Sequence, residues 1–152
     1  MPAPVTFWFE FASTYSYLSV MRIEAEAARR KVEVKWTPFL LGPIFKAQGW
    51  DTSPFNLYPA KGRNMWRDME RRAAKFAIPF KPWTGEDGRI FPQNGVLAAR
   101  TAIAALDEPW GRDFVRRVYT AQFAEGLDIS NPNVIGDCIE AAGGVDRIYL
   151  HM

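Results

Sequence analysis

Two hydrophobic patterns alternate over the first forty residues of the chain. Residues 5–11, VTFWFEF, alternate and are rich in β-branched and aromatic side chains, which predicts a mostly buried strand. Residues 15–30 carry apolar side chains at helical spacing, and residues 32–37, VEVKWT, alternate again. Pro38 limits the second strand because proline lacks the N–H that a sheet requires. The pattern predicts a β-α-β unit with parallel strands and the helix on one face.

Beyond Pro38 the pattern is mainly helical. The expected helices span about 43–48, 59–77, 94–107, 109–125 and 131–142, and the last begins with Asn131 as cap and Pro132 at the first helical position. Gly62 weakens the first turn of the long helix. Residues 78–93 hold three prolines and two glycines, which predicts an irregular segment. The result is β-α-β followed by about five helices, and a two-stranded sheet of this kind is not self-sufficient.

Composition and charge exclude several classes of protein. The net charge of +2 is too small to indicate nucleic-acid binding. No stretch is long and apolar enough to span a membrane, and the N-terminus lacks a signal-peptide pattern, so we expect a cytoplasmic protein. The one cysteine, Cys138, excludes an intrachain disulfide and a CxxC redox pair, and we expect it to be an inert buried thiol. With His151 as the one histidine, a Cys/His metal site and a histidine-based triad are both unsupported.

Three small hydroxyl residues, Ser13, Thr14 and Ser16, gather in FASTYSYLS, where the first strand leads into the first helix. A hydroxyl at this position commonly caps the helix by accepting a backbone N–H. The same position binds anions and thiolates well, because helix N-termini carry unpaired N–H groups and a partial positive charge. The C-terminal end of a parallel strand is also where open α/β sheets bind ligands. The residues alone leave both roles open.

The segment FWFEFASTYSYLS resembles the opening of DsbA-like thioredoxin-fold proteins, in particular the group of 2-hydroxychromene-2-carboxylate isomerases and kappa-class glutathione transferases. Four later segments resemble motifs of that group in the same order: VEVKWTPFLLGPIFKAQG, YPAKGRNMWRDMERRAAKF, FPQNGVLAAR and FAEGLDISNPNVI. The resemblance implies an α/β, thioredoxin-like fold with a large helical insertion. Its expected parts are a β-α-β half over residues 1–42, a helical subdomain over 43–142 and an atypical tail over 143–152.

The resemblance also implies a glutathione site. Ser13 matches the serine that contacts the glutathione sulfur in the family, and is therefore the implied catalytic residue. Lys61 matches a lysine that pairs with a glutathione carboxylate in relatives. Trp50 stands where many relatives carry an asparagine that contacts glutathione, so it is a candidate for glutathione binding, with a place in the wall of an apolar pocket as the alternative. Thr14 replaces a common proline of the family pattern.

Further residues are candidates for binding the substrate. Phe39 and Leu40 follow the second strand and are expected to line the site, with core packing as the alternative. Gln93 and Arg89 are candidates for reaching a carboxylate, and Asn94 is a candidate for substrate binding or for a helix cap.

The resemblance implies a glutathione-dependent isomerase that acts on a small aromatic carboxylate, such as a chromene carboxylate, by transient thiolate addition. A kappa-type glutathione transferase and a truncated, non-catalytic relative are the alternatives. The third alternative rests on the tail, because VDRIYLHM does not resemble the family's continuation, in which a cis-proline segment and two further strands complete the sheet. We therefore expect the C-terminal strands of the fold to be absent from this chain, and the resemblance suggests a homodimer.

Overall fold

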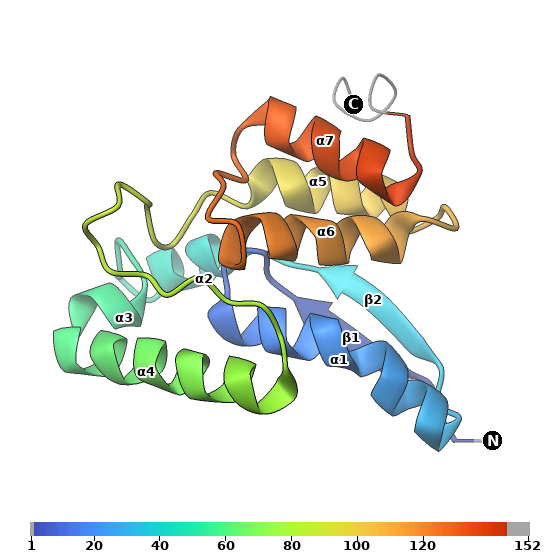
Figure 1. The fold of residues 1–152 in the computed structure, drawn as a ribbon, viewed down its shortest axis with the longest axis horizontal. Coiled ribbons are helices and arrows are strands. Elements are labelled where there is room, and N and C mark those ends of the chain that lie inside the picture. The colour runs from blue at the N-terminus through green and yellow to red at the C-terminus, as the bar shows by residue number, and fades with distance from the viewer. Residues whose placement is uncertain (1, 146–152) are drawn as a thin grey trace.

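The computed structural model describes residues 2–145, in which two strands and seven helices are found (Figure 1). In chain order these are β1 (Val5–Phe9), α1 (Thr14–Arg30), β2 (Val34–Pro38), α2 (Leu41–Ala47), α3 (Pro54–Leu57), α4 (Pro59–Phe76), α5 (Val96–Ala105), α6 (Gly111–Phe123) and α7 (Pro132–Ala142). The β-α-β unit and the five predicted helices are confirmed. The additional helix, α3, is a single turn of four residues, which is too short to produce a hydrophobic period.

The two strands are parallel, as predicted, and pair in a register that joins Phe7 to Trp36. The face that carries Phe7, Phe9 and Trp36 packs on the core, and the rings of Phe7 and Trp36 meet edge to face at 5.5 Å. The prediction of a mostly buried first strand is wrong, because Val5 is 50% exposed and Trp8 is 59% exposed. Only one face of β1 is covered by helices, so alternate side chains face outward.

The core is built around α6, whose buried side chains include Phe114, Val118 and Tyr119. Figure 1 shows α5, α6 and α7 (yellow to red) side by side, and α6 also contacts α1. Aromatic rings fill the space between them: Tyr119 stacks on Phe11 with ring centroids 5.1 Å apart. The aromatic residues of the turn after β1 are therefore fixed against α6.

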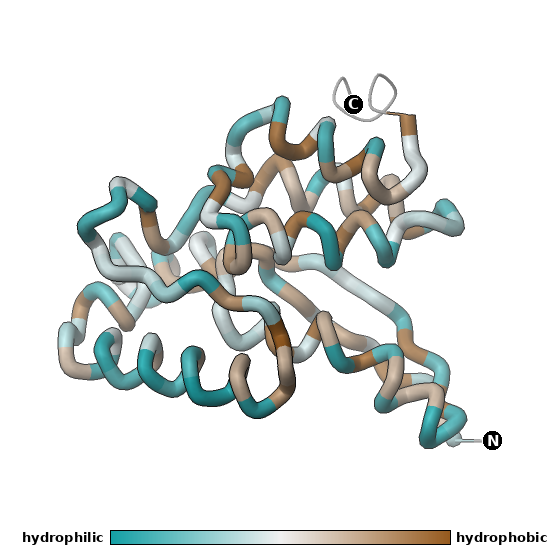
Figure 2. The backbone as a smooth tube through the Cα atoms, in the orientation of Figure 1, coloured by the Kyte–Doolittle hydropathy of each residue, from teal (hydrophilic) through white to brown (hydrophobic). Residues whose placement is uncertain are grey.

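Helix α4 is largely hydrophilic (Figure 2) and buries Met65, Met69 and Ala73. The Thr14 hydroxyl donates to the Met65 sulfur at 3.2 Å, which ties the first turn of α1 to α4. Gly62 is buried, and a Cβ atom there would overlap the carbonyl oxygen of Phe55. Gly62 therefore has a packing role, because the absence of a side chain lets the backbones of α3 and α4 meet.

The predicted boundary between residues 42 and 43 falls inside α2, and the helices beyond it pack directly on the β-α-β unit through contacts of α5 with β2 and of α6 with α1. Gly143 ends α7 in the left-handed conformation, with φ of 100°. The rest of the predicted tail, residues 146–152 with His151, lies outside the described residues. Within residues 2–145 no helix has the length and apolar character of a membrane span.

Candidate functional site

Ser13 is the N-cap residue of α1, and its backbone is extended with φ of −85° and ψ of 121°. Its hydroxyl oxygen accepts the Ser16 backbone N–H at 3.2 Å, so the capping role considered from the sequence is present. The hydroxyl proton has no acceptor among residues 2–145, and it remains available to donate to a ligand. Capping and ligand binding are therefore compatible, because they use different parts of the same hydroxyl group.

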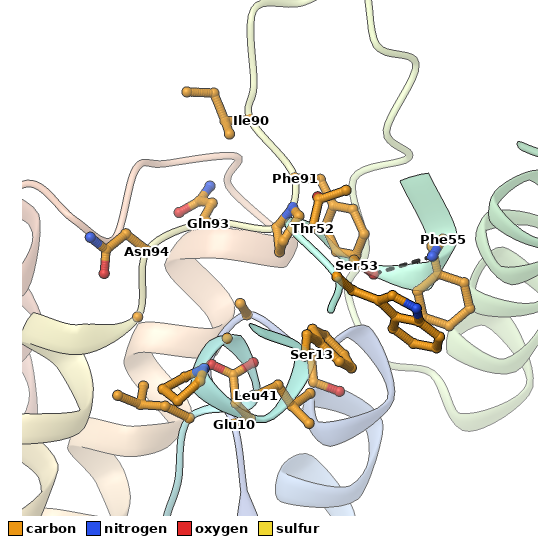
Figure 3. A pocket seen from close by; sticks show the side chains of 18 of the residues that line it. Glu10, Ser13, Leu41, Thr52, Ser53, Phe55, Ile90, Phe91, Gln93 and Asn94 are labelled. Carbon is orange, nitrogen blue, oxygen red and sulfur yellow. Dashed lines mark hydrogen bonds between the residues drawn. The ribbon is translucent and has the colours of Figure 1, made fainter. Parts of the chain in front are cut away.

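Ser13 opens into a cavity of about 460 Å³, which is within the usual size range of small-molecule sites. Three segments of the chain form it: the turn that enters α1, the stretch from the end of β2 to α3, and the residues that lead into α5. Its lining is mainly apolar and includes Leu40, Phe45, Trp50, Phe55 and Phe91. Figure 3 shows Glu10 and Ser13 on one side of this cavity and Gln93 and Asn94 on the other.

Glu10 was not predicted as a site residue, yet its side chain lines the cavity three residues before Ser13. The residue is only 5% exposed. Burial raises the pKa of the Glu10 carboxyl to about 7, and a hydrogen bond from the Ala12 backbone opposes this by a smaller amount. The Tyr119 hydroxyl donates to the Glu10 carbonyl oxygen at 2.6 Å, and Ser16 Oγ accepts the Glu10 N–H at 3.3 Å. The backbone of Glu10 is thus held from two sides.

Two of the predicted site residues that follow β2 line the cavity, Leu40 and Trp50, and the Trp50 ring lies 5.9 Å from that of Phe45. Two other predicted residues do not line it. Phe39 is half-buried and packs edge to face with the exposed Trp8, at 6.4 Å between ring centroids. Lys61 is exposed in the first turn of α4, so its pairing with a glutathione carboxylate stays a prediction.

Gln93 lines the cavity, but its amide group is bonded to the chain beyond α6. Its nitrogen donates to the Leu127 carbonyl at 3.1 Å, and its oxygen accepts the Ile129 N–H at 2.8 Å. Asn94 also lines the cavity, and its side-chain oxygen accepts the Val96 N–H at 3.0 Å at the start of α5. Both residues therefore shape the cavity wall, and a role in binding a substrate stays a prediction.

Arg89 and Cys138 lie away from this cavity. The Arg89 guanidinium forms an ion pair with Asp87 at 2.7 Å and donates hydrogen bonds to the backbone of its own loop. Asp87 therefore balances the positive charge of Arg89 within that loop. Cys138 is buried in α7, as expected, and burial raises the pKa of its thiol to about 11.

Several lining residues were missed from the sequence. Among them are polar residues of the loop before α3, Asp51, Thr52 and Ser53, and residues of the irregular segment, Ile90 to Pro92. The Phe91–Pro92 peptide bond is cis. Among the missed residues, Glu10 could have been found from the sequence, because a glutamate inside an apolar run such as FWFEF is unusual.

Comparisons with known proteins agree with this architecture. A family model described as the DSBA-like thioredoxin domain matches residues 4–148. A 2-hydroxychromene-2-carboxylate isomerase of Sphingobium xenophagum is 26% identical over 147 residues, which are 94% of this chain and 70% of that protein. The solved structure of a selenomethionine 2-hydroxychromene-2-carboxylate isomerase matches with a TM-score of 0.69 at 21% identity, over 96% of this chain and 68% of that chain. At that identity the structural likeness shows a shared fold.

Proposed function

The chain belongs to the DSBA-like thioredoxin domain family, and we propose that it is a glutathione-dependent isomerase of a small aromatic carboxylate. The proposal is supported by the likeness to a 2-hydroxychromene-2-carboxylate isomerase and by the position of Ser13. The single observation that carries it is that the Ser13 hydroxyl, with its proton unused, lies at the N-terminus of a 17-residue helix and lines a largely apolar cavity.

The residues that line the cavity fit a thiolate and an aromatic ring together. Glutathione, when bound, supplies the nucleophilic sulfur of the proposed reaction. The Ser13 O–H donates a hydrogen bond to a sulfur anion, and the partial positive charge of the α1 N-terminus favours the same charge state. Serine in this place excludes disulfide exchange, because no thiol side chain is available at the site.

The apolar walls serve the second half of the proposal. Phe45 approaches from α2 and Phe55 from α3, with Trp50 in the loop between them. Phe91 approaches from the segment that leads to α5. Aromatic faces hold a planar ring by burial and stacking and exclude water from the reacting atoms. Ser13 at one end and aromatic rings around it thus provide an anion-binding point inside an apolar cavity, which suits thiolate addition to a conjugated carboxylate.

The test is a calorimetric titration of reduced glutathione into the wild-type chain and into Ser13→Ala. We expect saturable binding that weakens about tenfold or more in the variant, because a hydrogen bond to an anion is lost. Asn131→Ala is the matched control, since Asn131 caps α7 by accepting the Asn133 N–H at 2.9 Å, outside the cavity lining. Its glutathione affinity is expected to equal that of the wild type.

Turnover then separates the proposed reaction from its alternative. Isomerisation of a chromene carboxylate that falls about 100-fold in Ser13→Ala supports the proposal, in line with the loss of one preorganised anion-stabilising donor. Conjugation of a model electrophile without isomerisation indicates a kappa-type transferase. A folded wild-type chain that binds no glutathione contradicts the proposed function.

A further inference from the structure

Glu10 differs from every other side chain of the cavity in being both ionisable and buried. Two carboxyl groups line the cavity, those of Glu10 and Asp51. Asp51 is exposed, whereas Glu10 is 5% exposed. Among residues 2–145, no lysine, arginine, histidine, cysteine or tyrosine lines the cavity. Glu10 is therefore the one buried ionisable side chain of the cavity lining, among residues 2–145, that can exchange a proton with a bound ligand.

The Glu10 carboxyl is held in place toward the cavity. Its Oε1 lies against Gly95, where a built Cβ atom would be 3.4 Å from that oxygen. Gly95 precedes the first turn of α5, so the carboxyl group lies close to the backbone where that helix begins. The Tyr119 hydroxyl and Ser16 hold the Glu10 backbone, which fixes the point from which the side chain enters the cavity. Figure 3 shows it pointing into the space between Ser13 and Asn94.

Within the described part of the chain, no cationic side chain lines the cavity to balance a negative charge on Glu10. The groups that face it are the Tyr119 hydroxyl from α6, Ser13 and Ser16 from α1, Asn94 and the N-terminus of α5, and the exposed Asp51 across the cavity. All of these side chains are neutral or acidic. A carboxylate and a thiolate in one cavity repel each other, so the ionised form of one disfavours that of the other.

We propose that Glu10 accepts the proton of a thiol that binds at Ser13 and returns it when that thiol leaves. This inference rests on the proposed function, because it names the proton acceptor of the same site. In the step, the S–H bond breaks and an O–H bond forms at the Glu10 carboxylate. The negative charge moves from the carboxylate to the sulfur, beside the Ser13 hydroxyl and the α1 N-terminus. Nothing is oxidised or reduced, and the reverse transfer restores both groups.

The ionisation of Glu10 supports this role. The pKa of Glu10, about 7, is closer to the pKa of a free thiol, about 8.5, than the pKa of an ordinary carboxyl is. The proton therefore moves between two groups of similar proton affinity. A carboxyl with an ordinary pKa would be a much weaker acceptor.

The test counts protons when reduced glutathione binds. Calorimetry in buffers of different ionisation enthalpy gives the number of protons released to solvent, and ultraviolet absorbance reports the bound thiolate. Above neutral pH the wild-type chain is expected to form thiolate with almost no proton released, because Glu10 keeps the proton. Glu10→Gln is expected either to release about one proton for each thiolate formed or to bind the thiol uncharged. Glu33→Gln, which removes an exposed carboxyl outside the cavity lining, is expected to behave like the wild type.

Three outcomes decide between the hypotheses. Thiolate formation in both proteins with the same number of protons released per thiolate overturns this inference while leaving glutathione binding intact. Absence of glutathione binding by the wild type overturns the proposed function and this inference with it. A fall of about 100-fold in isomerase kcat/KM in Glu10→Gln, with loss of the inflection near neutral pH, supports the inference.

A carboxyl NMR titration of the unliganded wild-type chain provides a check that needs no variant. A Glu10 carboxyl that titrates near neutral pH supports the inference, and one that titrates as an exposed glutamate overturns it. Glu10→Asp gives a second variant if Glu10→Gln folds poorly. Its shorter side chain keeps the acid and is expected to retain part of the proton uptake.

Discussion

The Ser13 backbone N–H donates a hydrogen bond to the Glu10 carbonyl oxygen at 3.0 Å, so both polar side chains at this end of the cavity belong to one closed turn. The turn stops β1 at Phe9 and starts α1 at Thr14. This backbone hydrogen bond fixes the distance between the points from which the two side chains enter the cavity.

Glu10 should make the stability of the chain depend on pH. The pKa of Glu10 is about 7 in the folded chain and near its ordinary 4.5 in the unfolded chain, so the folded state binds more protons between these two pH values. Stability conferred by the neutral carboxyl is complete below pH about 4.5 and is lost as the pH rises to about 7, by up to about 3 kcal/mol. Urea unfolding of Glu10→Gln against wild type should show a stability difference that grows over this window. A difference that does not vary with pH would contradict the prediction.

Gly62→Ala should destabilise the chain by about 1–3 kcal/mol, because the new methyl group overlaps the Phe55 carbonyl and pushes α3 from α4. Since Phe55 lines the cavity, glutathione binding should weaken as well. Gly42→Ala in α2 is the control for stability, because no atom lies within 4 Å of the added methyl group. It should leave stability unchanged or raise it by up to about 1 kcal/mol. Thermal unfolding of both variants gives the comparison.

Gln93→Leu should cost about 1–3 kcal/mol of stability, because the fully buried Ile129 loses the partner of its backbone N–H. The leucine keeps the size of the side chain but bonds neither Ile129 nor Leu127. Gln48→Leu, at an exposed position after α2, should change stability by less than about 0.5 kcal/mol. Equal effects of the two substitutions in chemical denaturation would show that the bridge from Gln93 does not stabilise the fold.

Cys138 should resist thiol reagents in the native chain. It is 1% exposed, and burial raises the pKa of its thiol to about 11, so the reactive thiolate is scarce at neutral pH. A colorimetric thiol assay should report one thiol per chain only after denaturant is added. Rapid labelling under native conditions would mean that α7 opens locally.

The sequence predicted the elements with strong periods and missed what depends on packing. Helices α1 and α4 to α7 follow apolar spacing. Helix α4 begins at Pro59 and α7 at Pro132, in line with the preference of proline for the first helical turn. The short α3 has no period of its own and is stabilised by contact with α4 through Gly62. The exposure of Trp8 depends on which face of the sheet the helices cover. The alternation of apolar residues along the strand does not determine whether one face or both faces are covered.

The candidate site was predicted where it depends on chain order. Ser13 lies at a strand-helix junction that a short motif defines, and Leu40 follows the second strand at the same end of the sheet. Glu10 was assigned to the strand because VTFWFEF alternates through it, whereas the strand ends one residue earlier and the glutamate turns toward the cavity. Phe39 and Lys61 lie outside the lining because side-chain direction, not sequence position, decides what faces the cavity.

The hydrogen bond from Tyr119 to Glu10 joins residues 109 positions apart. Closing a loop of that length carries an entropy penalty that only long-range packing can offset. A peptide of the strand, turn and first helix would hold the same hydroxyl and carboxyl groups without α6 to fix them. Recovery of ligand binding during refolding should therefore follow the slow formation of distant contacts rather than the fast formation of helices.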